Sequence, residues 1–304
     1  MRSLLSAVLL FGMGVAAADS GPVPSSVVWT APPPAQAAAK DGFIDVGDAR
    51  LWYWDTGGGG EPVILMHPQT GSAASWEYQQ PVFARAGYRV IGYSRRGHFK
   101  SERTSAEKIA AADDLLTLIK TLGIERFHLV GSAAGSFVAA DFALSHPEKL
   151  LTLVLASSTL NAQDPDHQEV IKRLIPKGFY AMPADFRELG PSYRAANPQG
   201  AARWSEIEEQ SRERSLPLPP SINRVTLEKL AALPMPLLLI SGDADLYIPH
   251  AVALKLADRI KRAELVLVEN AGHAVFWERP EEFNRAVLDF ISRRGREATA
   301  TSKR

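Results

Sequence analysis

The chain has 304 residues, of which 46% are hydrophobic and 22% charged, and its 34 basic and 34 acidic residues give a formal net charge of zero. A chain of this length can bury a sizeable core, and its balanced charge argues against nucleic acid or an anionic membrane as a partner. The sequence has no cysteine, which excludes disulfides, cysteine-ligated metal sites and thiol catalysis.

The first residues have the pattern of a secretory signal peptide, which we assign to 1–18. Arg2 is followed by an apolar run at 4–15 and by small residues at 16–18. An uncleaved membrane anchor is the alternative, but the run is short for a bilayer. We therefore expect export to a periplasm or the exterior, with no membrane contact after cleavage. Residues 19–40 are rich in proline and alanine and predict an extended linker.

The globular part begins with two short strand-like runs, at 43–46 and 49–54, which predict an antiparallel hairpin at a sheet edge. Apolar runs and amphipathic segments then alternate, which is typical of an α/β fold with a mostly parallel sheet covered by helices on both faces. The expected strands are 62–67, 88–94, 127–132, 150–157, 236–242 and 264–269. The expected helices are 74–86, 106–122, 135–146, 250–260 and 280–293.

The alternation is interrupted once, between 158 and 233, where the sequence predicts helices and no strand. An insertion of this length after the sixth strand predicts a helical cap over the carboxyl edge of the sheet, where open α/β sheets bind ligands. The core then comprises 41–157 and 234–295, and we expect a disordered tail at 296–304.

The segment 127–140 turns from a strand into an alanine-rich helix through two glycines, Gly131 and Gly135. This is the pattern of a nucleophile elbow, G-x-S-x-G, in which small residues allow the strand and helix backbones to approach closely. The position of the nucleophile falls on Ala133, which has no nucleophilic atom.

A general base and its orienting carboxylate are expected on two later loops. His273 follows the last expected strand, and the unperturbed pKa of histidine suits it to act as a base near neutral pH. Asp243 and Asp245 both follow the preceding strand. We prefer Asp245, which lies deeper in the loop, and interpret Asp243 as a turn residue. Neither has companions at metal-ligand spacing.

Two backbone amides are expected to form an oxyanion hole. One belongs to Ala134, the residue after the nucleophile position, at the positive end of a helix. The other should come from the loop at 67–72, where Pro68 has no amide hydrogen and Gln69 is the next donor. A plain turn after the strand is the alternative for this loop.

The order of elbow, aspartate and histidine, with the His-Pro-Gln loop upstream, resembles the α/β-hydrolase superfamily. The resemblance extends from about residue 42 to 293 and includes the arginine-containing turn at 93–101. It implies a capped, cofactor-free and metal-free hydrolase of carboxylic esters or lactones that acts on a small-molecule substrate. Carbon–carbon bond hydrolases share this machinery, whereas aspartate-nucleophile relatives fit less well. The chain departs from the family at Pro68, where glycine is usual, and at Ala133.

Five side chains are expected to contact the substrate. The bulky residues of the cap suggest that this substrate is apolar or aromatic. For the cap aromatics the alternative is that they form the cap's own core, and for His98 the alternative is a solvated turn. The five residues are His67, His98, Phe179, Tyr180 and Phe276.

Three hypotheses account for Ala133. The chain is an alanine variant of a serine hydrolase, inactive because its nucleophile is replaced. Alternatively, it is naturally non-hydrolytic and uses the pocket as a binding protein, receptor or lyase. Finally, Ser132 acts as a shifted nucleophile, although its side chain should point away from His273. The sequence predicts no oligomeric state.

Overall fold

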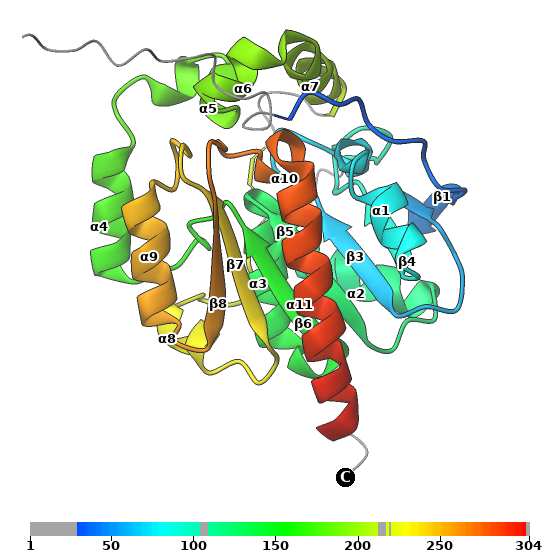
Figure 1. Ribbon diagram of the computed structural model, residues 1–304. Coiled ribbons are helices and arrows are strands. Elements are labelled where there is room, and N and C mark those ends of the chain that lie inside the picture. Colours follow the sequence, from blue (N-terminus) through cyan, green and yellow to red (C-terminus); the bar gives the residue numbers. More distant parts are fainter. Residues whose placement is uncertain (1–28, 104–108, 212–216, 219, 302–304) are drawn as a thin grey trace, which may run out of the picture.

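The computed structural model describes residues 29–103, 109–211, 217–218 and 220–301. Eight strands form one sheet in the order β1-β2-β4-β3-β5-β6-β7-β8. Figure 1 shows this sheet with helices packed around it. β1 pairs with β2, and β2 with β4, in antiparallel fashion, and every other pair is parallel. The strands are β1 (Lys40–Asp45), β2 (Arg50–Asp55), β3 (Pro62–Met66), β4 (Arg89–Tyr93), β5 (Phe127–Ser132), β6 (Leu150–Ala156), β7 (Leu237–Gly242) and β8 (Ala263–Val268).

Helices cover both faces of this sheet, so the predicted α/β fold and its edge hairpin are confirmed. Successive residues of β3 alternate between two apolar clusters, one on each face: Ile64 belongs to one and Leu65 to the other. β5, β6 and β7 are buried along their whole lengths, as expected for central parallel strands. One face carries α1 (Gln80–Arg85) and α11 (Pro280–Thr301), and the other carries α2 (Ala111–Thr121), α3 (Ala134–Ser145), α8 (Leu227–Ala231) and α9 (His250–Arg259).

Three predictions about helices and the C-terminal tail differ from the observed structure. The helix expected at 106–122 is not helical at 109–110 and begins at Ala111 as α2. The expected helix at 74–86 is divided into the 3₁₀ turn η2 (Ala73–Trp76) and α1, because Pro81 has no amide hydrogen and occupies the first turn of α1. At the other end of the chain, α11 continues to Thr301, so the predicted disordered tail is wrong for 296–301. Alanine and glutamate in this stretch are good helix formers.

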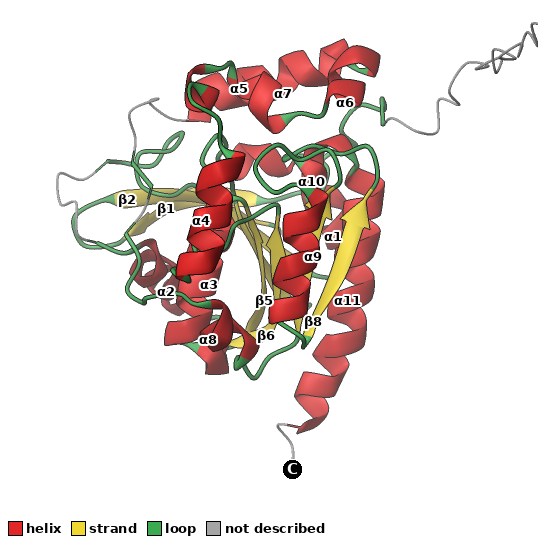
Figure 2. Cartoon of the chain, turned by 90° about the vertical axis from the view of Figure 1, so that its left-hand side faces the viewer, coloured by secondary structure: helices red, strands yellow, loops and turns green. Residues whose placement is uncertain are grey.

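The inserted segment 158–233 forms two groups of helices. α4 (Pro165–Leu174) and α8 lie beside the core and pack against the cluster that contains α9. By contrast, α5 (Ala184–Glu188), α6 (Pro191–Ala196) and α7 (Pro198–Ser211) lie above the sheet in Figure 2, with the turn η4 (Phe179–Ala181) before them. No strand occurs in the described part of the segment. The cap over the carboxyl edge is therefore smaller than the insertion.

The N-terminal segment 29–39 has no regular structure, and it contacts both the α/β core and the cap. The hydroxyl of Tyr78 donates to the carbonyl of Ala31 at 3.0 Å, and the side chain of Asn197, beside α7, donates to the carbonyl of Trp29 at 3.2 Å. The predicted signal peptide and the first part of the predicted linker lie outside the described residues, so export stays a prediction. None of the helices in the described ranges is both long and apolar enough to cross a membrane.

Candidate active site

The turn between β5 and α3 holds Ala133 in a strained conformation. Its φ of 50° and ψ of −115° lie outside the regions that non-glycine residues normally adopt. Its amide donates to the carbonyl of Ala156 at 2.9 Å, and its carbonyl accepts from the Ser158 hydroxyl at 3.2 Å. The geometry is that of an elbow whose apex is residue 133, with the amide of Ala134 opening the helix.

The two glycines of the elbow are required by close backbone contacts. A Cβ on Gly135 would lie 2.1 Å from the carbonyl oxygen of Met66, and one on Gly131 would lie 2.8 Å from the carbonyl of Gly135. Both distances are too short for a carbon atom, so larger residues cannot be placed there without moving the backbone. The contact with Met66 also brings the loop after β3 against the elbow.

The flanking serines do not supply a nucleophile. Ser136 is buried and donates to the carbonyls of Gly131 and Ala156. Ser132 is the last residue of β5, and its relative exposure is 0%. A hydroxyl enclosed in this way does not meet a substrate, so the hypothesis that Ser132 is a shifted nucleophile is wrong.

His273 is bound to Asp245 on the other side of the site. Nδ1 of His273 lies 2.8 Å from Oδ2 of Asp245, and Oδ1 of Asp245 accepts from the amides of Tyr247 and Ile248 at 2.7 and 3.0 Å. Both members of the pair are buried, whereas Asp243 is exposed. Asp245 therefore fixes the ring with its Nε2 directed away from the carboxylate, as a base or acid requires.

Two further carboxylates surround the histidine. Oε2 of Glu188, at the end of cap helix α5, lies 3.9 Å from Nε2 of His273. Glu278, in the short helix α10 (Val275–Glu278), accepts from the amides of Gly272 and Gly190 at 3.0 and 2.8 Å. Tyr247 stacks on the imidazole with ring centroids 4.2 Å apart.

These charges shift the titration of the site. Burial alone would lower the pKa of His273, but the negative charges of Asp245 and Glu188 outweigh it and raise that pKa to about 9. Burial also raises the pKa of Glu188, although His273 and Arg187 oppose the shift, and it raises the pKa of Glu278 to about 8. A histidine held in this way is protonated at neutral pH.

The side chain of His67 holds the loop after β3 through two hydrogen bonds. Nδ1 of His67 donates to the carbonyl of Pro68 at 2.7 Å, and Nε2 accepts from the amide of Arg95 at 3.0 Å. Burial, together with the positive charge of Arg95, lowers the pKa of His67 well below its ordinary value, so the ring is neutral. The guanidinium of Arg95 also donates to the side-chain oxygen of Gln69 at 3.2 Å. This network fixes the loop that contains the predicted oxyanion amide.

The predicted substrate contacts fall into two groups. His67 and Phe276 have interior partners: both ring nitrogens of His67 are bound, and Phe276 packs between Trp76 and Phe283 in the core. This leaves their predicted contact with a substrate without structural support. His98 is also buried, with its ring 4.5 Å from that of His67, so the alternative of a solvated turn is wrong.

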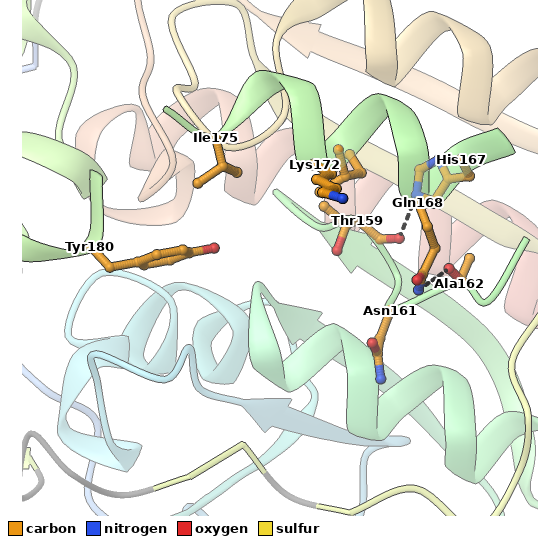
Figure 3. A pocket seen from close by; sticks show the side chains of 9 residues that line it. Thr159, Asn161, Ala162, His167, Gln168, Lys172, Ile175 and Tyr180 are labelled. Carbon is orange, nitrogen blue, oxygen red and sulfur yellow. Dashed lines mark hydrogen bonds between the residues drawn. The ribbon is translucent and has the colours of Figure 1, made fainter. Parts of the chain in front are cut away.

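The two aromatic residues of η4 lie near the histidine. Phe179 is buried and packs edge to face on Tyr247 at 4.9 Å, whereas Tyr180 is 68% exposed. Tyr180 also lines a cavity of about 410 Å³ beside α4, shown in Figure 3. The other residues that line this cavity are Thr159, Asn161, Ala162, His167, Gln168, Ile171, Lys172 and Ile175. Thr159 of this lining follows Ser158 in the chain, and the hydroxyl of Ser158 donates to the carbonyl of Ala133.

The sequence did not indicate the roles of Glu188, Tyr247 and Glu278. Glu188 lies in the cap, where no strand register predicts which side chains face the core. Tyr247 and Glu278 each lie within five residues of Asp245 or His273, and that proximity was the available signal. Among the described residues, no cluster of histidine and carboxylate side chains is arranged to hold a metal ion.

Comparison with known proteins agrees with the geometry. The model of the alpha/beta hydrolase family matches residues 63–286, most of the chain. The chain belongs to the alpha/beta hydrolase family. A 2-hydroxy-6-oxononadienedioate/2-hydroxy-6-oxononatrienedioate hydrolase of Burkholderia vietnamiensis is 31% identical over 268 residues, which cover 81% of this chain and 92% of that protein.

Two other proteins to which the chain is similar differ in the substrates or bonds that their names give. A 2-hydroxy-6-oxo-6-phenylhexa-2,4-dienoate hydrolase of Comamonas testosteroni is 30% identical over 278 residues, covering 84% of this chain and 96% of that protein. The structure of a thermophilic esterase from Thermogutta terrifontis superposes with a TM-score of 0.69 at 25% identity, covering 84% of this chain and all of that one. The similar proteins thus include hydrolases named for dienoate-type substrates and an esterase.

Proposed function

We propose that the site hydrolyses a carboxylic ester or lactone with an apolar or aromatic substituent. The observation that carries the proposal is the pairing of a strained elbow at Ala133 with a buried histidine whose Nδ1 is bound to Asp245. An elbow of this kind places the side chain at its apex against the substrate carbonyl, and the amides of Ala134 and Gln69 are the proposed donors to the oxyanion.

With alanine at the apex, the covalent route is closed to this chain. An Ala133→Ser change adds one oxygen to a side chain that is already half-buried at the right turn. Its hydroxyl would attack the carbonyl carbon, His273 would take the proton, and water would later release the acyl group. The chain is therefore proposed to be a serine hydrolase in which this one atom is missing.

Hydrolysis of a carbon–carbon bond is the second candidate, because two relatives at 30–31% identity are named as hydrolases of dienoate substrates. The same elbow and histidine would serve it. The aromatic residues Phe179 and Tyr180 suit either an aryl ester or an aryl-substituted dienoate.

Steady-state kinetics of the chain and its Ala133→Ser variant test the proposal. The substrates are a panel of p-nitrophenyl esters and aromatic lactones, together with a 2-hydroxy-6-oxo-dienoate. The variant is expected to gain several orders of magnitude in kcat/KM on esters, and His273→Ala in the same background should remove that gain. A gain confined to the dienoate would favour the second candidate. If the variant binds ligands but turns over neither class, the site is that of a receptor or lyase.

A further inference from the structure

Glu188 occupies a place in the site that the covalent route does not use. Its Oε1 accepts from the hydroxyl of Tyr247 at 3.2 Å, which turns Oε2 toward Nε2 of His273 at 3.9 Å. Nδ1, on the opposite edge of the ring, is bound to Asp245. The histidine therefore has a carboxylate on each side, and the second one lies at Nε2, the ring nitrogen that a catalytic histidine uses to exchange protons.

The position of Glu188 is fixed by its surroundings. Only 5% of its surface is exposed, and its carbonyl accepts from the amide of Ala274, next to His273, at 2.9 Å. The neighbouring amide of Gly190 is bound to Glu278, which also binds Gly272. Both links join the end of α5 to the histidine loop, so the carboxylate is held in place before any substrate arrives.

The separation of 3.9 Å is too long for a direct hydrogen bond and suits a shared water molecule. One water can lie within about 2.8 Å of both Nε2 and Oε2, beside the line that joins them. A carboxylate and an imidazolium around one water form a base and an acid on adjacent sides of the reacting centre.

We propose that Glu188 is a catalytic residue that, with His273, holds a water for direct attack on the substrate carbonyl, so that this chain hydrolyses without a covalent intermediate. The inference rests on the proposed function and names a different nucleophile for it. The water oxygen bonds to the carbonyl carbon as one of its protons passes to Glu188, and the carbonyl electron pair moves onto the oxyanion. When that intermediate collapses, the bond to the leaving oxygen breaks, and Nε2–H of His273 protonates the alkoxide.

Proton balance is restored inside the site. The proton on Glu188 returns to His273, so that an acid and an alcohol leave and the pair regains its starting state. Within the ranges that the structure describes, four charged or titratable groups, on three segments, face the pair. They are Asp245 and Tyr247 after β7, Glu278 on α10, and Arg187, which donates to the hydroxyl of Tyr247, on α5.

Kinetics on a p-nitrophenyl ester and the matching alkyl ester test this role, with five proteins compared: the unchanged chain, Glu188→Gln, Asp185→Asn, Ala133→Ser, and the double variant Ala133→Ser/Glu188→Gln. The unchanged chain should turn over without a burst, and Glu188→Gln should lower its kcat/KM by about 10²- to 10⁴-fold. Asp185→Asn removes the same charge from the same helix and should leave kcat/KM within about twofold.

The activity of the double variant shows whether a chain with Glu188→Gln still folds. The double variant should retain kcat/KM within about tenfold of the Ala133→Ser variant, because the hydroxyl then replaces the water. The inference is overturned if Glu188→Gln leaves the unchanged chain as active as before, or lowers both backgrounds equally. It is also overturned, with the proposed function intact, if Ala133→Ser is active and the unchanged chain is silent. If both are silent, the proposed function itself fails.

Discussion

The carboxylate of Glu278 accepts a hydrogen bond from the amide of Gly190 at 2.8 Å, and this contact joins the cap to the loop that carries His273. The two backbones meet so closely that a Cβ on Gly272 would lie 2.4 Å from the nitrogen of Gly190. The catalytic loop and the cap are thus one packed unit, and the position of Glu188 depends on it.

Removal of this carboxylate should destabilise the protein. Glu278→Ala leaves two buried amides without acceptors, and each unsatisfied donor costs about 1–3 kcal/mol in the free energy of unfolding. Urea denaturation should show the loss, and the exposed Glu169→Ala, on α4, is the control. A midpoint unchanged by Glu278→Ala would contradict the structural role of the contact.

The same residue gives a pH dependence of stability. Burial raises the pKa of Glu278 to about 8, so its protonated form is favoured in the folded state. Its contribution to stability is complete below the pKa of an unfolded glutamate, about 4.5, and is lost as the pH rises through about 8. Denaturation midpoints measured from pH 4.5 to 8.5 should fall less steeply for Glu278→Gln than for the unchanged chain. Parallel slopes would contradict the shift.

Activity should depend on pH in opposite ways in the two backgrounds. In the unchanged chain, His273 acts as an acid and Glu188 as a base, so kcat/KM should rise as Glu188 ionises and fall above about pH 9, where His273 loses its proton. In Ala133→Ser, a neutral His273 is the base, and kcat/KM should still rise toward pH 9. Profiles of kcat/KM from pH 5 to 10, corrected for hydrolysis by hydroxide, distinguish the two proteins. Identical profiles would contradict the account in which His273 is the acid in the unchanged chain and the base in Ala133→Ser.

The choice between the two aspartates can be measured in the Ala133→Ser background. Asp245→Asn should lower kcat by about 10³- to 10⁴-fold, because the amide does not hold the required tautomer of His273. Asp243→Asn, on the exposed part of the same loop, should leave kcat within about twofold. Equal losses in the two variants would show that the loop matters as a whole rather than through one carboxylate.

The elbow predicts the effect of a single methyl group. Gly135→Ala places a carbon 2.1 Å from the carbonyl of Met66, so β3 and the elbow must separate, at a cost of about 3 kcal/mol or more in unfolding free energy. Gly59→Ala adds the same methyl where no atom lies within 4 Å and should change stability by less than about 1 kcal/mol. Thermal unfolding of the two variants measures the difference.

The sequence predicted those parts of the molecule that depend on parallel strands. β7 and β8 are neighbouring parallel strands, so their carboxyl ends lie at the same edge of the sheet, which is why Asp245 and His273 could be expected to pair. Glu188 could not be expected, because the cap helices have no register with the sheet. Phe276 is predicted to contact the substrate, but its ring packs on Trp76 in the interior.

The most direct measurement is mass spectrometry of the Ala133→Ser variant, quenched with acid within milliseconds of mixing with a p-nitrophenyl ester. For the variant we predict an acyl adduct on the peptide that contains position 133. Replacing His273 by alanine in the same variant should greatly slow the formation of this adduct. The unchanged chain should form no adduct. An absence of any adduct while the variant hydrolyses the ester, or an adduct at another residue, would contradict the assignment of position 133 as the apex of a hydrolase elbow.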